Sequence, residues 1–66
     1  MDKKAIGLKL KELRREKTLK EVASAVGIST SALGMYETGQ RIPTDNIKIK
    51  LAKYFNTTVD AIFFSS

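Results

Sequence analysis

The sequence of 66 residues contains no cysteine, no histidine, no tryptophan and a single proline. Without cysteine, neither a disulfide nor a cysteine-based metal site can stabilise the chain. Without histidine, the chain also lacks the usual acid–base group at neutral pH and a common zinc ligand. The seven carboxylates stand mostly in helix-cap or ion-pair contexts rather than in converging pairs. We therefore expect no metal site, no cofactor and no enzymatic activity.

Long apolar runs are missing too, since none approaches the roughly 20 residues that span a bilayer. The N-terminus is charged throughout and lacks the apolar core of a signal peptide. We therefore expect a cytoplasmic protein that does not enter a membrane. A chain of this length should form one domain, residues 1–66, whose small core buries roughly 60% of the surface of the unfolded chain. Dimerisation would extend such a core.

Positive charge is in excess: 12 lysines and arginines against seven acidic residues give a net charge of +5. This excess indicates a polyanionic partner, with nucleic acid ahead of a membrane surface or an acidic protein. Basicity alone is weak evidence, because many soluble domains are this basic.

A first helix is predicted over residues 5–16, where Ile6, Leu10 and Leu13 form one apolar stripe among lysines and arginines. Gly7 weakens its first turn by about 1 kcal/mol relative to alanine. A basic amphipathic helix can also lie on an anionic membrane. Its apolar side has no Trp or Phe, however, and the helices that follow need this side for their core.

The stretch 22–37 predicts two short helices joined by a turn. Thr18 and Glu21 match the capping box that starts the first of them. Gly27 can take the left-handed conformation that ends it, and Ser29 can cap the next helix, which runs to about residue 37 or 38 before Gly39. This is the sequence form of a helix-turn-helix. An ordinary αα-hairpin in a helical bundle fits these residues equally well.

The outer surface predicted for this third helix is small and nearly uncharged. Leu33 and Tyr36, helped by Ala32, form its buried side, and its other positions are Thr30, Ser31, Gly34, Met35 and Thr38. A helix kept only for packing more often carries Lys and Glu outside. Short side chains instead let a large flat surface come close to the backbone, which favours docking.

Two more helices complete the prediction. Thr44 can cap a fourth helix that ends near Phe55, with an apolar stripe at Ile47, Leu51, Ala52 and Phe55. The alternation over residues 47–51 would also suit an exposed strand, but no second strand is available to pair with it. Asn56 is a plausible left-handed stop. Thr58 then caps a last short helix, which carries Val59, Ile62, Phe63 and Phe64.

From about residue 6 to 63 the chain resembles the phage-repressor-like (Cro/C1-type, XRE family) helix-turn-helix regulators. The resemblance lies in LKELRREK, EVASAVGIS, YETGQRIP at residues 36–43 and KLAKYFNTTVDAIF. It implies an all-α, compact five-helix domain of the lambda-repressor-like DNA-binding type, with a helix-turn-helix at helices 2 and 3. Such a domain usually acts as a homodimer on a near-palindromic operator in double-stranded DNA and regulates transcription, here expected as a repressor.

Individual roles follow from this resemblance. The positions that meet base edges are Thr30, Ser31, Ala32 and Met35, although Met35 also fits a half-buried edge of the core. Phosphate contacts fall on Arg14, Thr18, Lys20, Thr38, Gln40 and Arg41, together with the backbone amides near Thr18 and Thr38. Arg14 and Glu37 correspond to a structural ion pair between helices 1 and 3.

Two departures from the family pattern bear on these roles. The connection over residues 17–20 is two residues shorter than usual. Either Thr18 matches the family's threonine and Leu19 replaces a phosphate-binding glutamine, or Leu19 matches the family's leucine and that Thr-Gln pair is missing. The predicted reading face also lacks Arg, Asn and Gln, which make bidentate contacts to bases. We therefore expect hydroxyl and methyl contacts and DNA shape to supply specificity.

The last helix is the predicted dimer interface, through Val59, Ile62, Phe63 and Phe64. The alternative is that Phe63 belongs to the core and Phe64 is a frayed end.

We expect the regulator to bind no small-molecule ligand. Two other functions compete with this interpretation. One is an antitoxin or partner-binding module of the same fold, which usually needs an additional segment that we do not expect in this chain. The other is non-specific RNA or chromosome binding.

Overall fold

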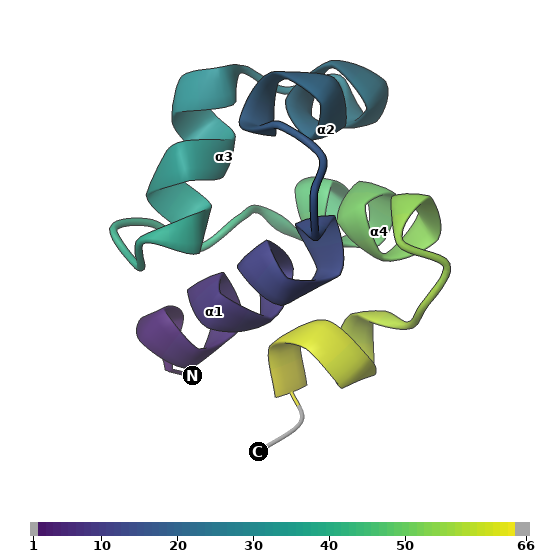
Figure 1. Cartoon of the computed structure of the whole chain (residues 1–66). Coiled ribbons are helices and arrows are strands. Elements are labelled where there is room, and N and C mark those ends of the chain that lie inside the picture. Colours follow the sequence, from purple (N-terminus) through teal and green to yellow (C-terminus); the bar gives the residue numbers. More distant parts are fainter. Residues whose placement is uncertain (1, 65–66) are drawn as a thin grey trace.

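The computed structural model describes residues 2–64, which form five helices and no strand (Figure 1). In chain order these are α1 (Lys3–Arg14), α2 (Leu19–Val26), α3 (Thr30–Glu37), α4 (Asp45–Tyr54) and a short π-helical segment, η1 (Asp60–Phe64). The all-α architecture agrees with the prediction. Within residues 2–64, none of these helices has the length and apolar character needed to cross a membrane.

The first helix is shifted towards the N-terminus relative to its prediction of 5–16. It begins at Lys3 because the side chain of Asp2 accepts hydrogen bonds from the amides of Lys4 and Ala5, at 3.0 and 3.2 Å. This is the bonding pattern of an N-cap. The helix ends at Arg14, two residues before the predicted end, because the chain turns sharply there.

That sharp turn, which joins α1 to α2, depends on an unusual backbone conformation at Arg15. The amide of Lys17 donates to the carbonyl of Arg14 at 3.2 Å, and Arg15 has φ 55° and ψ −126°. These are close to the angles of the first central position in a type II′ turn, which favours glycine. This tight turn lets the shortened connection join the end of α1 to the start of α2.

The remaining caps follow the prediction with one exception. Thr18 and Glu21 form the capping box of α2, Asn56 has a positive φ of 57°, and Thr58 Oγ1 accepts from the amide of Ala61 at 3.0 Å. Thr44 precedes α4, but its side chain makes no capping hydrogen bond. The predicted side-chain cap at Thr44 is therefore wrong; an acidic residue, Asp45, stands in the first turn instead.

The core lies where all five helices meet. In Figure 1, α1 runs below α3, η1 lies beside α1, and α2 lies above α4 and beside α3, in contact with both. Leu10, Val22 and Leu51 are almost completely buried at its centre. The core as a whole consists of Ile6, Leu10, Val22, Ala23, Val26, Leu33, Tyr36, Leu51, Ala52, Ile62 and Phe63.

Gly7 lies at the point of closest approach between α1 and the end of α3. A Cβ built on Gly7 would fall 2.7 Å from the carbonyl oxygen of Tyr36 and closer still to that of Glu37. Any side chain here would push α3 away. The weakening of the first turn expected from this glycine is thus offset by close contact between the two helices.

Lys48 is buried, which the alternating pattern of residues 47–51 did not predict. Only 8% of Lys48 is exposed, whereas Ile49 is 46% exposed. The Lys48 ammonium lies 5.7 Å from the ring centroid of Phe63 and 5.4 Å from that of Phe64, with Asp45 Oδ1 at 3.7 Å. These cation–π contacts and the ion pair replace part of the hydration that the ammonium loses on burial.

Candidate nucleic-acid interface

The turn between α2 and α3 has the predicted helix-turn-helix geometry. Gly27 adopts the left-handed conformation, with φ 87° and ψ 32°, and its amide donates to the carbonyl of Ala23 at 2.8 Å. Ser29 Oγ then accepts from the amide of Ala32 at 3.0 Å and starts α3. Each of these residues satisfies backbone groups that a helix end leaves unpaired.

Arg14 and Glu37 form the expected ion pair and fix the end of α3 against α1. Arg14 Nε donates to Glu37 Oε2 at 2.7 Å, and its Nη2 donates to Oε1 at 3.0 Å. Its Nη1 also donates to the carbonyl of Lys17 at 2.6 Å. The hydrogen bonds that Arg14 donates to the Glu37 carboxylate raise the pKa of Arg14 above its ordinary value. Since a guanidinium has five N–H groups, two remain for an outside partner.

The sequence analysis did not identify Lys17 as part of the site, although its main-chain carbonyl accepts a hydrogen bond there. This carbonyl holds the Arg14 guanidinium at the α1–α2 turn, so the same arginine joins that turn to the end of α3. No residue pattern marks a main-chain acceptor of this kind, because any residue type could supply the carbonyl. The tight turn around Arg15 is what brings it into reach.

The outer surface of α3 carries the four predicted base-reading residues with unequal exposure. Thr30 and Ser31 are exposed, and within residues 2–64 their hydroxyls have no hydrogen-bond partner. Met35 is partly exposed. Ala32 packs against the core, so only part of its surface faces outward. The carboxylate of Glu37, the one acidic residue of α3, is held by Arg14, which leaves this surface without an exposed carboxylate.

The loop after α3 offers side chains rather than backbone amides to a phosphate. The amides of residues 38–41 all donate to carbonyls of α3, at 2.9 to 3.3 Å. The hydroxyl of Thr38 donates to the Gly34 carbonyl at 2.9 Å and accepts from Gln40 Nε2 at 3.0 Å. The prediction that backbone amides near Thr38 are available to a phosphate is therefore wrong, because these amides donate to the last carbonyls of α3. The side chains of Gln40 and Arg41 are exposed.

At the start of α2 the cap uses the groups that the sequence suggested for a phosphate. The Thr18 hydroxyl accepts from the Glu21 amide at 3.0 Å, and the Thr18 amide donates to Glu21 Oε1 at 3.4 Å. A phosphate arriving here would meet the Glu21 carboxylate. Thr18 is the N-cap of α2, and Leu19 is its first helical residue, packed against the core. Lys20 is exposed beside them.

The four residues predicted for a dimer interface lie at different depths. Ile62 and Phe63 are only 2% and 3% exposed and belong to the chain's own core, so they offer almost no surface to a second copy. They are buried because η1 packs against α1. Val59 is partly buried against the same core. Phe64 is 59% exposed.

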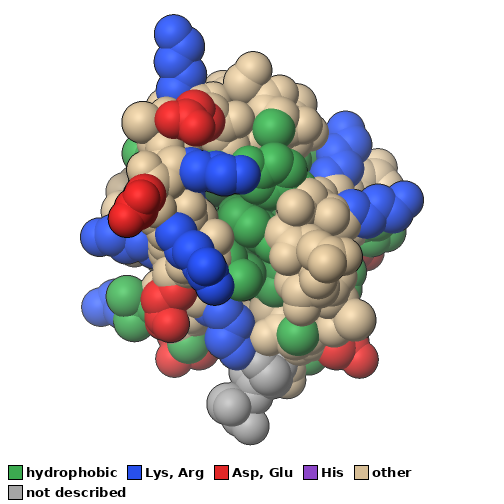
Figure 2. Space-filling model, turned by 45° about the vertical axis from the view of Figure 1, so that its right-hand side comes forward, with side chains coloured by type: hydrophobic (Ala, Val, Ile, Leu, Met, Phe, Trp, Pro, Cys, Tyr) green, Lys and Arg blue, Asp and Glu red, His purple; other side chains and the backbone are tan. Residues whose placement is uncertain are grey.

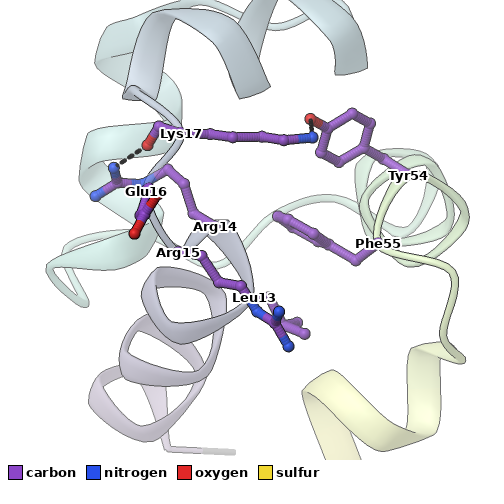
Figure 3. A pocket seen from close by; sticks show the side chains of 7 residues that line it. All are labelled: Leu13, Arg14, Arg15, Glu16, Lys17, Tyr54 and Phe55. Carbon is purple, nitrogen blue, oxygen red and sulfur yellow. Dashed lines mark hydrogen bonds between the residues drawn. The ribbon is translucent and has the colours of Figure 1, made fainter.

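A cavity of about 830 Å³, lined in part by Arg14, lies between the α1–α2 turn and the end of α4 (Figure 3). Its lining includes Leu13, Lys17, Tyr54 and Phe55 but no residue of α3. Lys17 extends across it and donates to the Tyr54 hydroxyl at 3.0 Å, which raises the pKa of Lys17. Figure 2 shows a face with hydrophobic side chains at its centre and Lys and Arg side chains on both sides of them.

Comparison with known proteins places the chain in a family. Residues 10–62 match the helix-turn-helix family HTH_3. The chain therefore belongs to this family, and it is a DNA-binding regulator of the Cro/C1 (XRE) type rather than an enzyme. No curated protein sequence matches the chain.

Several solved structures share the fold. The restriction-modification controller protein C.AhdI from Aeromonas hydrophila is 28% identical, with a TM-score of 0.86, over 94% of this chain and 97% of that one. The SOS-response repressor LexA from Eubacterium rectale is 25% identical over 98% and 71% of the two chains, with a TM-score of 0.89. The P22 c2 repressor, solved with a synthetic operator, is 17% identical over 92% and 96%, with a TM-score of 0.87. The last likeness shows the fold alone.

Proposed function

We propose that the chain is a repressor that binds a near-palindromic operator as a homodimer, with α3 in the major groove. The observation that carries this proposal is the outer surface of α3. It is short-chained and bears no exposed carboxylate, and the Arg14–Glu37 pair fixes its orientation. The major groove, about 12 Å wide, admits one α-helix. A helix held in this way can approach base edges without rearranging.

Sequence readout falls to Thr30, Ser31 and Met35, with a smaller contribution from the part of Ala32 that faces outward. Hydroxyls can donate to or accept from a base, and the Met35 and Thr30 side chains can touch thymine methyl groups. None of these makes the bidentate contacts of Arg, Asn or Gln. DNA shape and deformability therefore carry a large share of the specificity.

Phosphate contacts supply most of the affinity. Their donors are the exposed side chains of Lys20, Gln40 and Arg41 and the two remaining N–H groups of Arg14. Thr18 and Thr38 act indirectly, since their hydroxyls hold the ends of the helices that carry these donors. Each cation that neutralises a phosphate releases a condensed counterion, so affinity falls steeply with salt.

Two further observations support an operator-binding dimer. The P22 c2 repressor of similar fold was solved with an operator, and other similar structures are named as regulators or repressors. The ring of Phe64 is exposed on η1, and Val59, the residue just before η1, is partly exposed. We propose that these two residues make the dimer contact, while Ile62 and Phe63 hold η1 from within.

A binding-site selection on random duplex DNA tests this function. We expect the full chain to enrich a near-palindromic motif whose half-sites are centred about one helical turn apart. Equal recovery of all duplexes would contradict operator binding and favour non-specific nucleic-acid binding. An enriched motif without two-fold symmetry would support sequence-specific DNA binding but contradict the proposed homodimer.

A further inference from the structure

Gly34 differs from the other three glycines of the chain because the fold gives no reason for it. Gly27 and Gly39 have positive φ angles of 87° and 78°, which favour glycine. Gly7 leaves no room for a side chain against the end of α3. Gly34 lies inside α3 with an ordinary helical backbone, and a Cβ built on it would meet nothing within 4 Å.

A glycine in the middle of a helix lowers stability relative to alanine. Alanine would fit at position 34 without contact and would favour the helical state. The loss matters in a domain this small, whose core consists of a few side chains per helix. The stability of the fold therefore does not explain why position 34 is a glycine. The explanation has to come from the surface around it.

Those surroundings are the outer surface of α3. Residues three or four positions apart are neighbours on a helix, so Thr30 and Ser31 border Gly34 on one side and Thr38 borders it on the other. The hydroxyls of Thr30 and Ser31 have no partner within residues 2–64. The Thr38 hydroxyl is already bonded to the Gly34 carbonyl at 2.9 Å. Gly34 is thus a bare stretch of backbone with available hydroxyls beside it.

We infer that Gly34 is the point at which α3 touches a base edge directly, backbone against base, in the major groove. This inference rests on the proposed function and adds a specificity-determining residue to the same site. The edge lies on the Cα of Gly34, and the Thr30 or Ser31 hydroxyl bonds to its polar groups. A Cβ at position 34 would hold the helix away from the base. A gap of even 0.5–1 Å forfeits a quarter to a half of a van der Waals contact, and it lengthens the hydroxyl bonds beside it.

The test is Gly34→Ala in the full chain, measured for thermal unfolding and for binding to the duplex that the wild-type chain selects. We expect the melting temperature to rise by about 4–8 °C, as a gain in helix propensity predicts for a domain of this size. We expect affinity for the selected duplex to fall at least about tenfold, and a repeated selection to change at one or two adjacent base pairs. Binding to unrelated duplexes should be unchanged, because the phosphate contacts remain.

Ala25→Gly is the matched control. Ala25 is exposed on α2 and lines a shallow groove with Lys50, Lys53 and Tyr54 of α4, away from α3. This variant should lower the melting temperature by a similar amount and bind the selected duplex as the wild-type chain does. If Gly34→Ala gains stability and still binds with the wild-type affinity and motif, the inference is wrong. If it loses stability, the premise that the fold does not need Gly34 is wrong. If the wild-type chain selects no duplex, the proposed function itself fails.

Discussion

Arg14 and Glu37 are joined by two parallel hydrogen bonds, of 2.7 and 3.0 Å, between the end of α1 and the end of α3. Their side chains are only 16% and 6% exposed. Bidentate geometry at a partly buried position makes such a pair stronger and more directional than a surface ion pair. It sets where the C-terminal end of α3, and with it the outer surface, stands relative to the rest of the domain.

Glu37→Gln should lower the free energy of unfolding by about 1–3 kcal/mol, because it leaves the Arg14 guanidinium half-buried beside a neutral partner. Urea unfolding measures this loss. Glu16→Gln, at an exposed carboxylate near the same turn, should change stability by no more than about 0.5 kcal/mol. Equal effects of the two substitutions would show that the pair contributes no more than a surface charge.

Arg15→Gly should stabilise the chain, because glycine adopts the positive φ of 55° without the steric cost that arginine bears. We expect a gain of about 0.5–1 kcal/mol in the free energy of unfolding. Arg15→Ala removes the same charge and keeps the strained backbone, so it should give no such gain. If alanine stabilises as much as glycine does, the effect comes from charge and the strain at Arg15 is not its cause.

Local signals in the sequence predicted much of this fold. The capping box at Thr18, the left-handed Gly27 and the cap at Ser29 depend on residues within a few positions, and the structure contains all three. Features that depend on distant neighbours could not be predicted in this way. Lys48 is buried because the rings of Phe63 and Phe64 lie beside it, and no local pattern carries that information.

The same distinction applies to the site. The pairing of Arg14 with Glu37 was expected from the family resemblance, and the structure contains it. The hydroxyl of Thr38 and the amides that follow it looked available in the sequence. They are engaged because the C-terminal end of α3 satisfies its own carbonyls. Helix boundaries follow from the caps, but the partners of individual polar groups follow only from the three-dimensional arrangement.

Phe63 and Phe64 are adjacent residues for which we expect opposite behaviour. Phe63→Ala should cost about 3–5 kcal/mol of stability, since its ring is 3% exposed in the core. Phe64→Ala should cost about 1 kcal/mol or less, since the ring is 59% exposed. Sedimentation at micromolar concentration should show the wild-type chain as a dimer and Phe64→Ala shifted towards the monomer. A monomeric wild-type chain would reject Phe64 as a dimer contact.

Arg41→Ala should weaken binding to all duplexes by a similar factor and reduce the salt dependence by about one phosphate contact. The reason is that Arg41 is exposed in the loop after α3, which we propose lies against the phosphate backbone. Binding titrations at several salt concentrations give the slope. Lys53→Ala, on α4, is the control and should leave the slope unchanged. A loss confined to the selected motif would instead assign Arg41 to base readout.

The central claim is that α3 reads DNA bases through its small exposed side chains, and binding-site selection with Thr30→Ala tests it most directly. The Thr30 residue is exposed at the start of α3, and removing its hydroxyl breaks no hydrogen bond within the described residues 2–64. We expect the variant to fold as before and to select a motif that differs from the wild-type motif at a particular base pair, with the remaining positions kept. Recovery of the unchanged wild-type motif would contradict the placement of α3 against the bases.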